Sequence, residues 1–214
     1  MGNQNNPTRV MLVDDHAVVR AGLKRLLEQD SLFSVVAEAE SAERSYQLFQ
    51  EHLPDVTIMD LSMPGMGGIE GIRRIIARYP TAKILVLSMH DNASFANQAL
   101  KAGARGYLSK NGFADELADA IQWILTGKIY LSTEIAKKIA LNVNADDDNK
   151  LSALSAREFE IFRMLLDGMD LSHISQTLNI STKTAANYQT SVRRKLGFNT
   201  PVEMVRLAIS AGLI

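Results

Sequence analysis

The stretch VMLVDDHAVVR, residues 10–20, places two adjacent carboxylates, Asp14 and Asp15, directly after an apolar run. The run has the length of a buried β-strand, and a helical pattern begins immediately after the two aspartates. Adjacent carboxylates repel each other unless they stay hydrated or share a cation. The stretch therefore predicts a strand–turn–helix unit whose turn is either a hydrated helix cap or the site of a positive charge.

The same strand–helix pattern occurs five times in the first part of the chain. Apolar runs predict strands at residues 10–13, 35–37, 56–59, 84–87 and 106–108. Apolar residues three or four apart predict helices at residues 17–29, 42–51, 69–78, 93–101 and 113–125. Strict alternation of strands and helices is typical of a parallel sheet covered on both faces. We expect an α/β doubly wound, five-stranded parallel sheet of the flavodoxin type.

The last part of the chain shows a helical pattern only. Helices are predicted at residues 156–167, 171–178, 182–196 and 201–211. One further helix, at 133–141, precedes the stretch NVNADDDNK, whose three aspartates and three asparagines are typical of a linker. We expect a first domain at residues 8–126, a linker with one helix at 127–150, and a small all-α domain at 151–214.

The composition excludes several classes of protein. The chain has 214 residues, a formal net charge of −1 and no cysteine, which rules out disulfides, thiolate metal sites and cysteine nucleophiles. No apolar run approaches the ~18 residues of a membrane span. The polar beginning, MGNQNNPTR, lacks the apolar segment of a secretion signal. We therefore expect a cytoplasmic protein with no membrane partner.

Polar side chains occur where the predicted strands end. They are Asp14 and Asp15 after the first strand, Asp60 after the third, Ser88 after the fourth and Lys110 after the fifth. Because the carboxyl ends of parallel strands share one edge of the sheet, we expect these side chains to meet there. The ordinary alternative for each is a helix cap, a turn serine or a solvated lysine.

The carboxylates predict a magnesium site that supports phosphoryl transfer. Oxygen ligands, with no histidine or cysteine nearby, suit Mg²⁺. Asp60 is the best candidate nucleophile, because carboxylates can form aspartyl-phosphates. Asp15 and Asp60 would bind the ion directly, Asp14 through water, and the backbone carbonyl of Ser62 would add a ligand. The Lys110 ammonium would neutralise phosphate oxygens, and the Ser88 hydroxyl would donate to one.

Four motifs at these strand ends resemble a known family. VDDH (13–16), MDLSMPGMGG (59–68), LSMH (87–90) and AGARGYLSK (102–110) are similar to the receiver domain of bacterial two-component response regulators. The resemblance implies that Asp60 accepts a phosphoryl group from a sensor histidine kinase, with Mg²⁺ required. It also implies that Ser88 and Tyr107 are the hydroxyl and aromatic switch positions, although Tyr107 alone would be interpreted as a half-buried aromatic residue.

The charge of the helical part is unevenly distributed. Residues 171–202 contain no acidic residue and four basic ones, Lys183, Arg193, Arg194 and Lys195. In the helix predicted at 182–196, one face carries Lys183, Asn187, Thr190 and Arg194. With the helix and turn before it, this helix completes a helix-turn-helix, and these four side chains are candidates for DNA contacts. The alternative is a solvated surface helix.

Three further motifs resemble a DNA-binding family. LSAREFEIFRMLLDG (154–168), ISTKTAANY (180–188) and RKLGF (194–198) are similar to the LuxR-type DNA-binding domain, and both halves together resemble the NarL/FixJ subfamily of response regulators. Ala185 and Ala186 stand where that family often has valine and lysine, so a basic contact at position 186 is missing.

The resemblance implies a transcription regulator that binds DNA as a homodimer when active. Val202, Val205 and Ile209 of the last helix would form a dimer contact or pack within their own domain.

Two other functions are compatible with parts of the pattern. Magnesium-dependent phosphatases also form an aspartyl-phosphate, but their nucleophile usually follows the first strand, whereas Asp60 follows the third. We therefore expect no enzyme activity beyond slow self-dephosphorylation. The second alternative is a phosphorylation-controlled protein-interaction output without sequence-specific DNA binding.

Overall fold

The computed structural model describes residues 6–63, 65–89, 93–142, 150–151, 153–211 and 213–214. The chain forms two compact units, the first from residues 1–91 and 99–133 and the second from residues 92–98 and 134–214. Helix α4 (Ala93–Ala102) contributes residues to both units.

The first unit is built on a parallel sheet. Its strands are β1 (Thr8–Val13), β2 (Phe33–Ala39), β3 (Val56–Met59), β4 (Ile84–Ser88), β5 (Gly106–Ser109) and β6 (Tyr130–Leu131), in the order β2-β1-β3-β4-β5-β6. The predicted α/β doubly wound sheet is confirmed, but it has a sixth strand where five were predicted. The additional strand, β6, pairs with β5 through Gly106 and Tyr130. Two residues are too few for an apolar run to reveal a strand.

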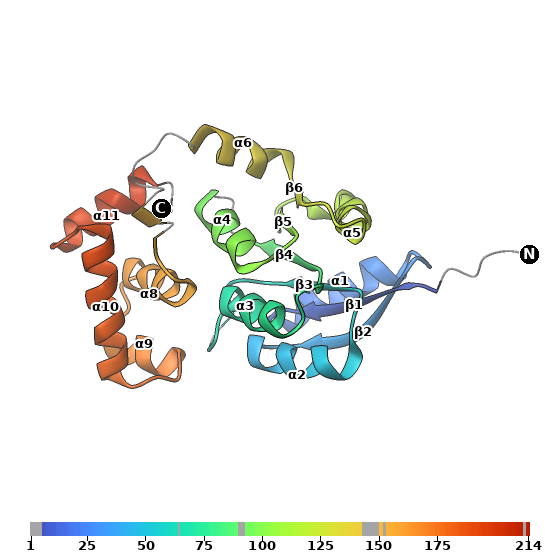
Figure 1. The fold of residues 1–214 in the computed structure, drawn as a ribbon, viewed down its shortest axis with the longest axis horizontal. Coiled ribbons are helices and arrows are strands. Elements are labelled where there is room, and N and C mark those ends of the chain that lie inside the picture. Colours follow the sequence, from blue (N-terminus) through green and yellow to red (C-terminus); the bar gives the residue numbers. More distant parts are fainter. Residues whose placement is uncertain (1–5, 64, 90–92, 143–149, 152, 212) are drawn as a thin grey trace, which may run out of the picture. The chain divides into compact units, whose positions relative to one another are not determined.

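Helices cover both faces of this sheet (Figure 1). They are α1 (Ala17–Glu28), α2 (Ala42–His52), α3 (Gly68–Arg78) and α5 (Leu117–Leu125), the last preceded by a short 3₁₀ helix (Phe113–Asp115). α1 and α5 share one core with alternate strand residues, among them Ile58 of β3. The next residue, Met59, faces the other side, where a Cβ on Gly71 of α3 would lie 2.9 Å from Ala42 Cβ of α2. α2 and α3 therefore pack together on the face opposite α1 and α5.

The second unit is helical. Its helices, besides the first part of α4, are α6 (Thr133–Asn142), α8 (Ala156–Leu166), α9 (Leu171–Thr177), α10 (Thr182–Leu196) and α11 (Pro201–Ser210). The helix-turn-helix of α9 and α10 is held by a buried cluster of Ile161, Ile174, Leu178 and Ala185. Local signals set the ends of α10, because Ser181 caps its first turn and Gly197 follows it with a φ of 76°. The predicted all-α helix-turn-helix domain is confirmed.

None of the helices in the described part of the chain combines the length and the apolar composition needed to cross a membrane.

Candidate functional site

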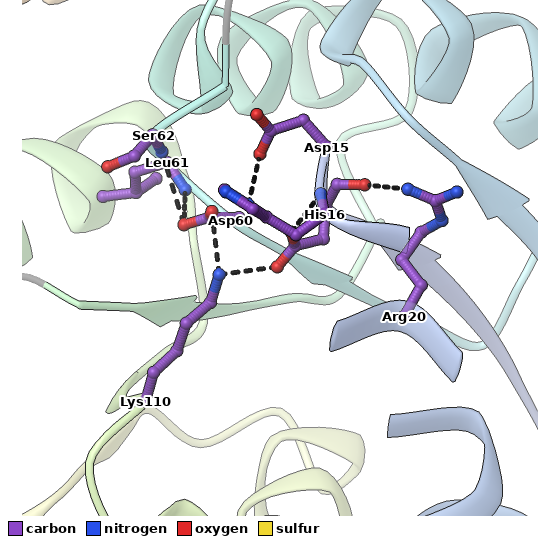
Figure 2. A network of polar contacts seen from close by, with 8 residues as sticks. Asp15, His16, Arg20, Asp60, Leu61, Ser62 and Lys110 are labelled. Atoms are coloured by element: carbon purple, nitrogen blue, oxygen red, sulfur yellow. Dashed lines mark hydrogen bonds and ion pairs between the residues drawn. The ribbon is translucent and has the colours of Figure 1, made fainter. Parts of the chain in front are cut away.

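The carboxylates Asp14, Asp15 and Asp60, called the acidic cluster below, lie at the carboxyl edge of the sheet. Figure 2 shows Asp15 and Asp60 of this cluster beside Lys110. The β1–β3 register pairs Val13 with Met59, so the next residues, Asp14 and Asp60, are neighbours. The Asp60 backbone N–H donates to Val13 O at 2.8 Å. Asp14 and Asp60 are only 2% and 3% exposed. The sheet register thus brings together two buried carboxylates that are far apart in the sequence.

Lys110 joins the two buried carboxylates. Its ammonium donates to Asp14 Oδ2 at 2.5 Å and to Asp60 Oδ2 at 2.8 Å. Burial raises the pKa of Asp60 above its ordinary value, and the hydrogen bond and charge of Lys110 offset only part of that rise. Burial alone would lower the pKa of Lys110, but its two carboxylate partners outweigh it and the pKa is raised. Lys110 is therefore a cation, set between two carboxylates.

The two oxygens of Asp60 have different surroundings. Oδ1 accepts the backbone N–H of Leu61 at 2.7 Å and that of Ser62 at 3.3 Å. Oδ2 faces the Lys110 ammonium. The backbone thus fixes the orientation of the carboxyl group, and Oδ2 is the oxygen next to the Lys110 ammonium.

A histidine lies beside the acidic cluster. His16 Nδ1 is 2.9 Å from Asp15 Oδ1 and 3.3 Å from Asp14 Oδ1, and the His16 backbone N–H donates to Asp14 Oδ1 at 2.8 Å. The prediction that no histidine lies nearby is wrong, although VDDH itself contained the signal. Ligand atoms of Asp14, Asp15, His16 and Asp60 all lie within 4.8 Å of one another. The three carboxylates are the donors that Mg²⁺ prefers, so this cluster fits such an ion.

Arg20 of α1 stabilises the turn between β1 and α1 through a hydrogen bond to its main chain. Its guanidinium Nη1 donates to the backbone oxygen of Asp14 at 2.5 Å. Figure 2 shows Arg20 beside the acidic cluster. Its Nε lies 4.0 Å from Glu38 Oε2 on β2. Arg20 thereby fixes the main chain that carries Asp14. This contact could not be predicted from the sequence, because the Asp14 carbonyl comes within reach of Arg20 only once the turn between β1 and α1 has folded.

The loop after Asp60 packs closely against it. A Cβ on Gly68 would lie 2.1 Å from Asp60 O, so only glycine fits there. Glu43 of α2 holds the same loop, because its Oε1 accepts the backbone N–H of Met66 at 2.9 Å. Ser62, whose carbonyl was predicted as a metal ligand, lies next to Asp60 in this loop (Figure 2).

Ser88 and Tyr107 lie on the neighbouring strands β4 and β5. Ser88 is buried at the end of β4, and its backbone oxygen accepts the Lys110 N–H at 2.7 Å. Tyr107 pairs with Val86 and is 0% exposed, so it is fully buried rather than half-buried. The end of β4 is therefore connected directly to Lys110.

The predicted DNA-contact residues share the exposed side of α10. Lys183, Asn187, Thr190 and Arg194, called the α10 face below, are all exposed, whereas Ala185 and Val192 are buried in the second unit. The Thr190 hydroxyl donates to Ala186 O at 2.9 Å.

One of the four basic residues of α10, Lys195, is paired with a carboxylate of α8. Lys195 Nζ lies 2.6 Å from Glu158 Oε2, and the Ser191 hydroxyl donates to Glu158 Oε1 at 2.6 Å. Burial would raise the pKa of Glu158, but these hydrogen bonds lower it to about 2. The sequence count of four positive charges therefore overstates what α10 presents to a partner, since only Lys183, Arg193 and Arg194 remain.

The last helix, α11, exposes an apolar row. Val202, Val205 and Ile209 are 69%, 39% and 60% exposed. Val205 is more than half covered, so packing within its own domain contributes there, and the dimer contact of this row stays a prediction.

Comparisons with known proteins agree on one family. Residues 10–122 match the model of the response regulator receiver domain, and residues 152–208 match that of the luxR family of bacterial regulatory proteins. The response regulator UvrY of Escherichia coli K12 is 37% identical over 206 residues, which cover 95% of this chain and 94% of UvrY.

Solved structures of RcsB are similar over nearly the whole chain. RcsB of Salmonella enterica serovar Typhimurium, bound to promoter rprA with the phosphomimetic BeF₃⁻, has a TM-score of 0.69 and 27% identity, covering 94% of this chain and 98% of RcsB. A structure of two RcsB dimers bound to two parallel DNAs has a TM-score of 0.61 and 27% identity, covering 96% and 99%.

Proposed function

Because this chain belongs to the NarL/FixJ-type response regulators of two-component systems, which join a receiver domain to a LuxR-type DNA-binding domain, we propose that phosphorylation of Asp60 controls its binding to DNA. We assign residues 8–126 to the receiver and residues 151–214 to the DNA-binding domain. The observation that carries the proposal is the buried Asp60 carboxylate, oriented by backbone N–H groups and paired with Lys110.

Asp60 Oδ2 is the attacking atom in this proposal. It forms a bond to phosphorus while the bond between phosphorus and a histidine nitrogen of the partner kinase breaks, and the histidine keeps the electron pair. Lys110 stays beside Oδ2 and neutralises charge on the transferred oxygens. Asp15 and Asp60 would hold Mg²⁺ directly, Asp14 through water, and Ser62 through its carbonyl. A bound Mg²⁺ would supply further positive charge at the phosphoryl oxygens.

The phosphoryl group then acts through Lys110 and Ser88. It adds nearly two negative charges at Asp60 and attracts both side chains. Since the Lys110 N–H is bonded to Ser88 O, a shift of either residue moves the end of β4 beside Tyr107. We assign Ser88 and Tyr107 to the switch that changes the α4–β5 surface.

The α10 face is the proposed DNA contact. Lys183 and Arg194 offer cations at its two ends, and Asn187 and Thr190 lie between them. Dimers on DNA are recorded for RcsB. The exposed row Val202, Val205 and Ile209 of α11 offers a contact through which two copies of this chain would pair.

The proposal includes no enzyme turnover apart from slow self-dephosphorylation. The partners are a sensor histidine kinase, DNA and a second copy of the chain, and the compartment is the cytoplasm, where a DNA-binding regulator acts.

Acetyl phosphate labelling tests the receiver. The full-length protein is incubated with acetyl phosphate and Mg²⁺ and separated on a phosphate-affinity gel. We expect wild type and the control Asp119→Asn, an exposed carboxylate of α5, to shift equally, and Asp60→Asn to remain unshifted. Labelling of Asp60→Asn at the wild-type level would contradict the assignment.

Salt dependence separates DNA binding from a protein-interaction output. Because Lys195 is paired with Glu158, the other three exposed cations of α10 would release about three counterions per monomer, giving a slope near −2.7 in log affinity against log salt at ~0.9 per phosphate contact. Affinity is measured by fluorescence anisotropy with and without phosphorylation. A chain with no salt-dependent affinity for duplex DNA in either state would favour the protein-interaction output.

A further inference from the structure

Thr190 presents less hydrogen-bonding capacity than its sequence suggests. It lies in the middle of the α10 face and is exposed, yet its hydroxyl donates its only proton to Ala186 O within the same helix, at 2.9 Å. A threonine hydroxyl has one donor and two acceptor lone pairs. With the donor engaged, Thr190 offers a partner only a methyl group and an accepting oxygen.

This limits which bases Thr190 can recognise in the major groove. Guanine presents two acceptors there, N7 and O6, which call for a donor that Thr190 has already used. Thymine presents a C5-methyl group, which makes apolar contacts with threonine and alanine methyl groups. Ala186, one helical turn before Thr190, adds a second small apolar side chain. Thr190 and Ala186 therefore place two small methyl groups beside Asn187 on α10.

Asn187 lies three residues before Thr190 on the same face. Within the described residues its side chain makes no hydrogen bond that would occupy the amide. An asparagine amide matches the N6 and N7 edge of adenine with two hydrogen bonds. An amide beside a methyl group is the combination that distinguishes A·T pairs.

We propose that the α10 face reads an A·T pair, with Asn187 bound to adenine and Thr190 specifying thymine through its C5-methyl group. The inference rests on the proposed DNA-binding function and names the bases that this function would select. Lys183 and Arg194, at the outer ends of the face, contact phosphates or flanking bases.

Replacing thymine by uracil tests the methyl contact, because uracil lacks only the C5-methyl group. The probe is a duplex selected from a random pool by the phosphorylated full-length protein, with its thymines changed to uracil one at a time. A buried methyl group contributes about 0.8 kcal/mol, which corresponds to roughly fourfold in affinity. We expect one thymine in each half-site to show this fourfold loss with wild-type protein.

Two variants of Thr190 separate its methyl group from its hydroxyl. Thr190→Ser removes the methyl group, so it should bind the thymine duplex about fourfold more weakly and be indifferent to uracil. Thr190→Val keeps a methyl group and removes the hydroxyl, so it should retain the sensitivity to uracil. Thr126→Ser is the matched control, because the exposed Thr126 also donates to a helix carbonyl, Trp123 O at 2.7 Å, in the other unit.

The results of these experiments separate the methyl contact of Thr190 from DNA binding itself. Equal binding of wild type to every uracil-substituted duplex would overturn the methyl contact while leaving DNA binding intact. If Thr190→Val loses affinity while Thr190→Ser binds as wild type does, the hydroxyl oxygen recognises the base. That result would also overturn the methyl contact. Failure to select any duplex would overturn both the DNA-binding function and the inference.

Discussion

The ion pair between the buried Glu158 and the partly exposed Lys195 makes a quantitative prediction for the stability of the second unit. Glu158 on α8 is 5% exposed and lies 2.6 Å from the Lys195 ammonium of α10. Despite burial, its hydrogen bonds lower its pKa from 4.5 to about 2. At ~1.36 kcal/mol for each pKa step, this favours the folded state by roughly 3 kcal/mol when Glu158 is ionised.

The direction of the pH dependence follows from the lowered pKa. The contribution of Glu158 is fully present above pH 4.5, the ordinary value, and is lost as the pH falls from there toward 2. Lys195→Met leaves the carboxylate without its cation but with its serine hydrogen bonds, and because Lys195 is about one-third exposed we expect a loss of about 1–3 kcal/mol in the free energy of unfolding at pH 7. This loss should shrink in acid, because a protonated Glu158 no longer needs the cation.

Urea unfolding of the full chain, followed by circular dichroism of its helices, measures these differences. The control is Lys138→Met, which breaks the exposed pair with Glu134 in α6 and should cost no more than about 0.5 kcal/mol. A double-mutant cycle with Glu158→Gln isolates the coupling between Glu158 and Lys195. Equal costs for the two lysine variants at pH 7, or a coupling near zero, would refute the reasoning.

Three further predictions concern the two candidate sites. Because burial raises the pKa of Asp60, Asp60→Asn should raise the melting temperature at pH 7 without Mg²⁺. This gain should vanish as the pH falls through the folded-state pKa of Asp60. A calorimetric melting temperature below that of wild type at pH 7 would be against this prediction. Gly68→Ala should lose acetyl phosphate labelling, because its Cβ would meet Asp60 O at 2.1 Å, whereas Gly22→Ala, with open space around its Cβ, should label normally. Arg194→Gln should reduce the salt slope of DNA binding by about 0.9. Lys195→Gln should leave the slope unchanged, because the Lys195 charge is already paired with Glu158. Equal slopes in the two variants would count against DNA contact through the α10 face.

The sequence predicted the fold because its local patterns agree with the global arrangement. The apolar runs before Asp14 and Asp60 predicted buried strands, and parallel pairing of β1 with β3 then places both residues at one edge. The strand β6 was missed, since Tyr130 and Leu131 make no pattern of their own and pair only because α5 returns the chain to the sheet.

The contacts that could not be predicted from the sequence all depend on side-chain orientations that are set only once the backbone has folded. His16 turns back over Asp15, and Arg20 reaches the Asp14 carbonyl across one turn of α1. Glu158 and Lys195 lie 37 residues apart and meet only when α8 packs on α10. A count of charges along the sequence treats Lys195 as available to DNA, whereas in the folded domain its charge is paired with Glu158.

Mapping the phosphoryl group is the most direct test of the central claim that Asp60 is the acceptor. The protein is labelled with acetyl phosphate and Mg²⁺, the aspartyl-phosphate is reduced with borohydride to homoserine, and the peptides are identified by mass spectrometry. We predict homoserine at position 60, with Asp14 and Asp15 unchanged. Homoserine at another aspartate, with Asp60 intact, would contradict the account.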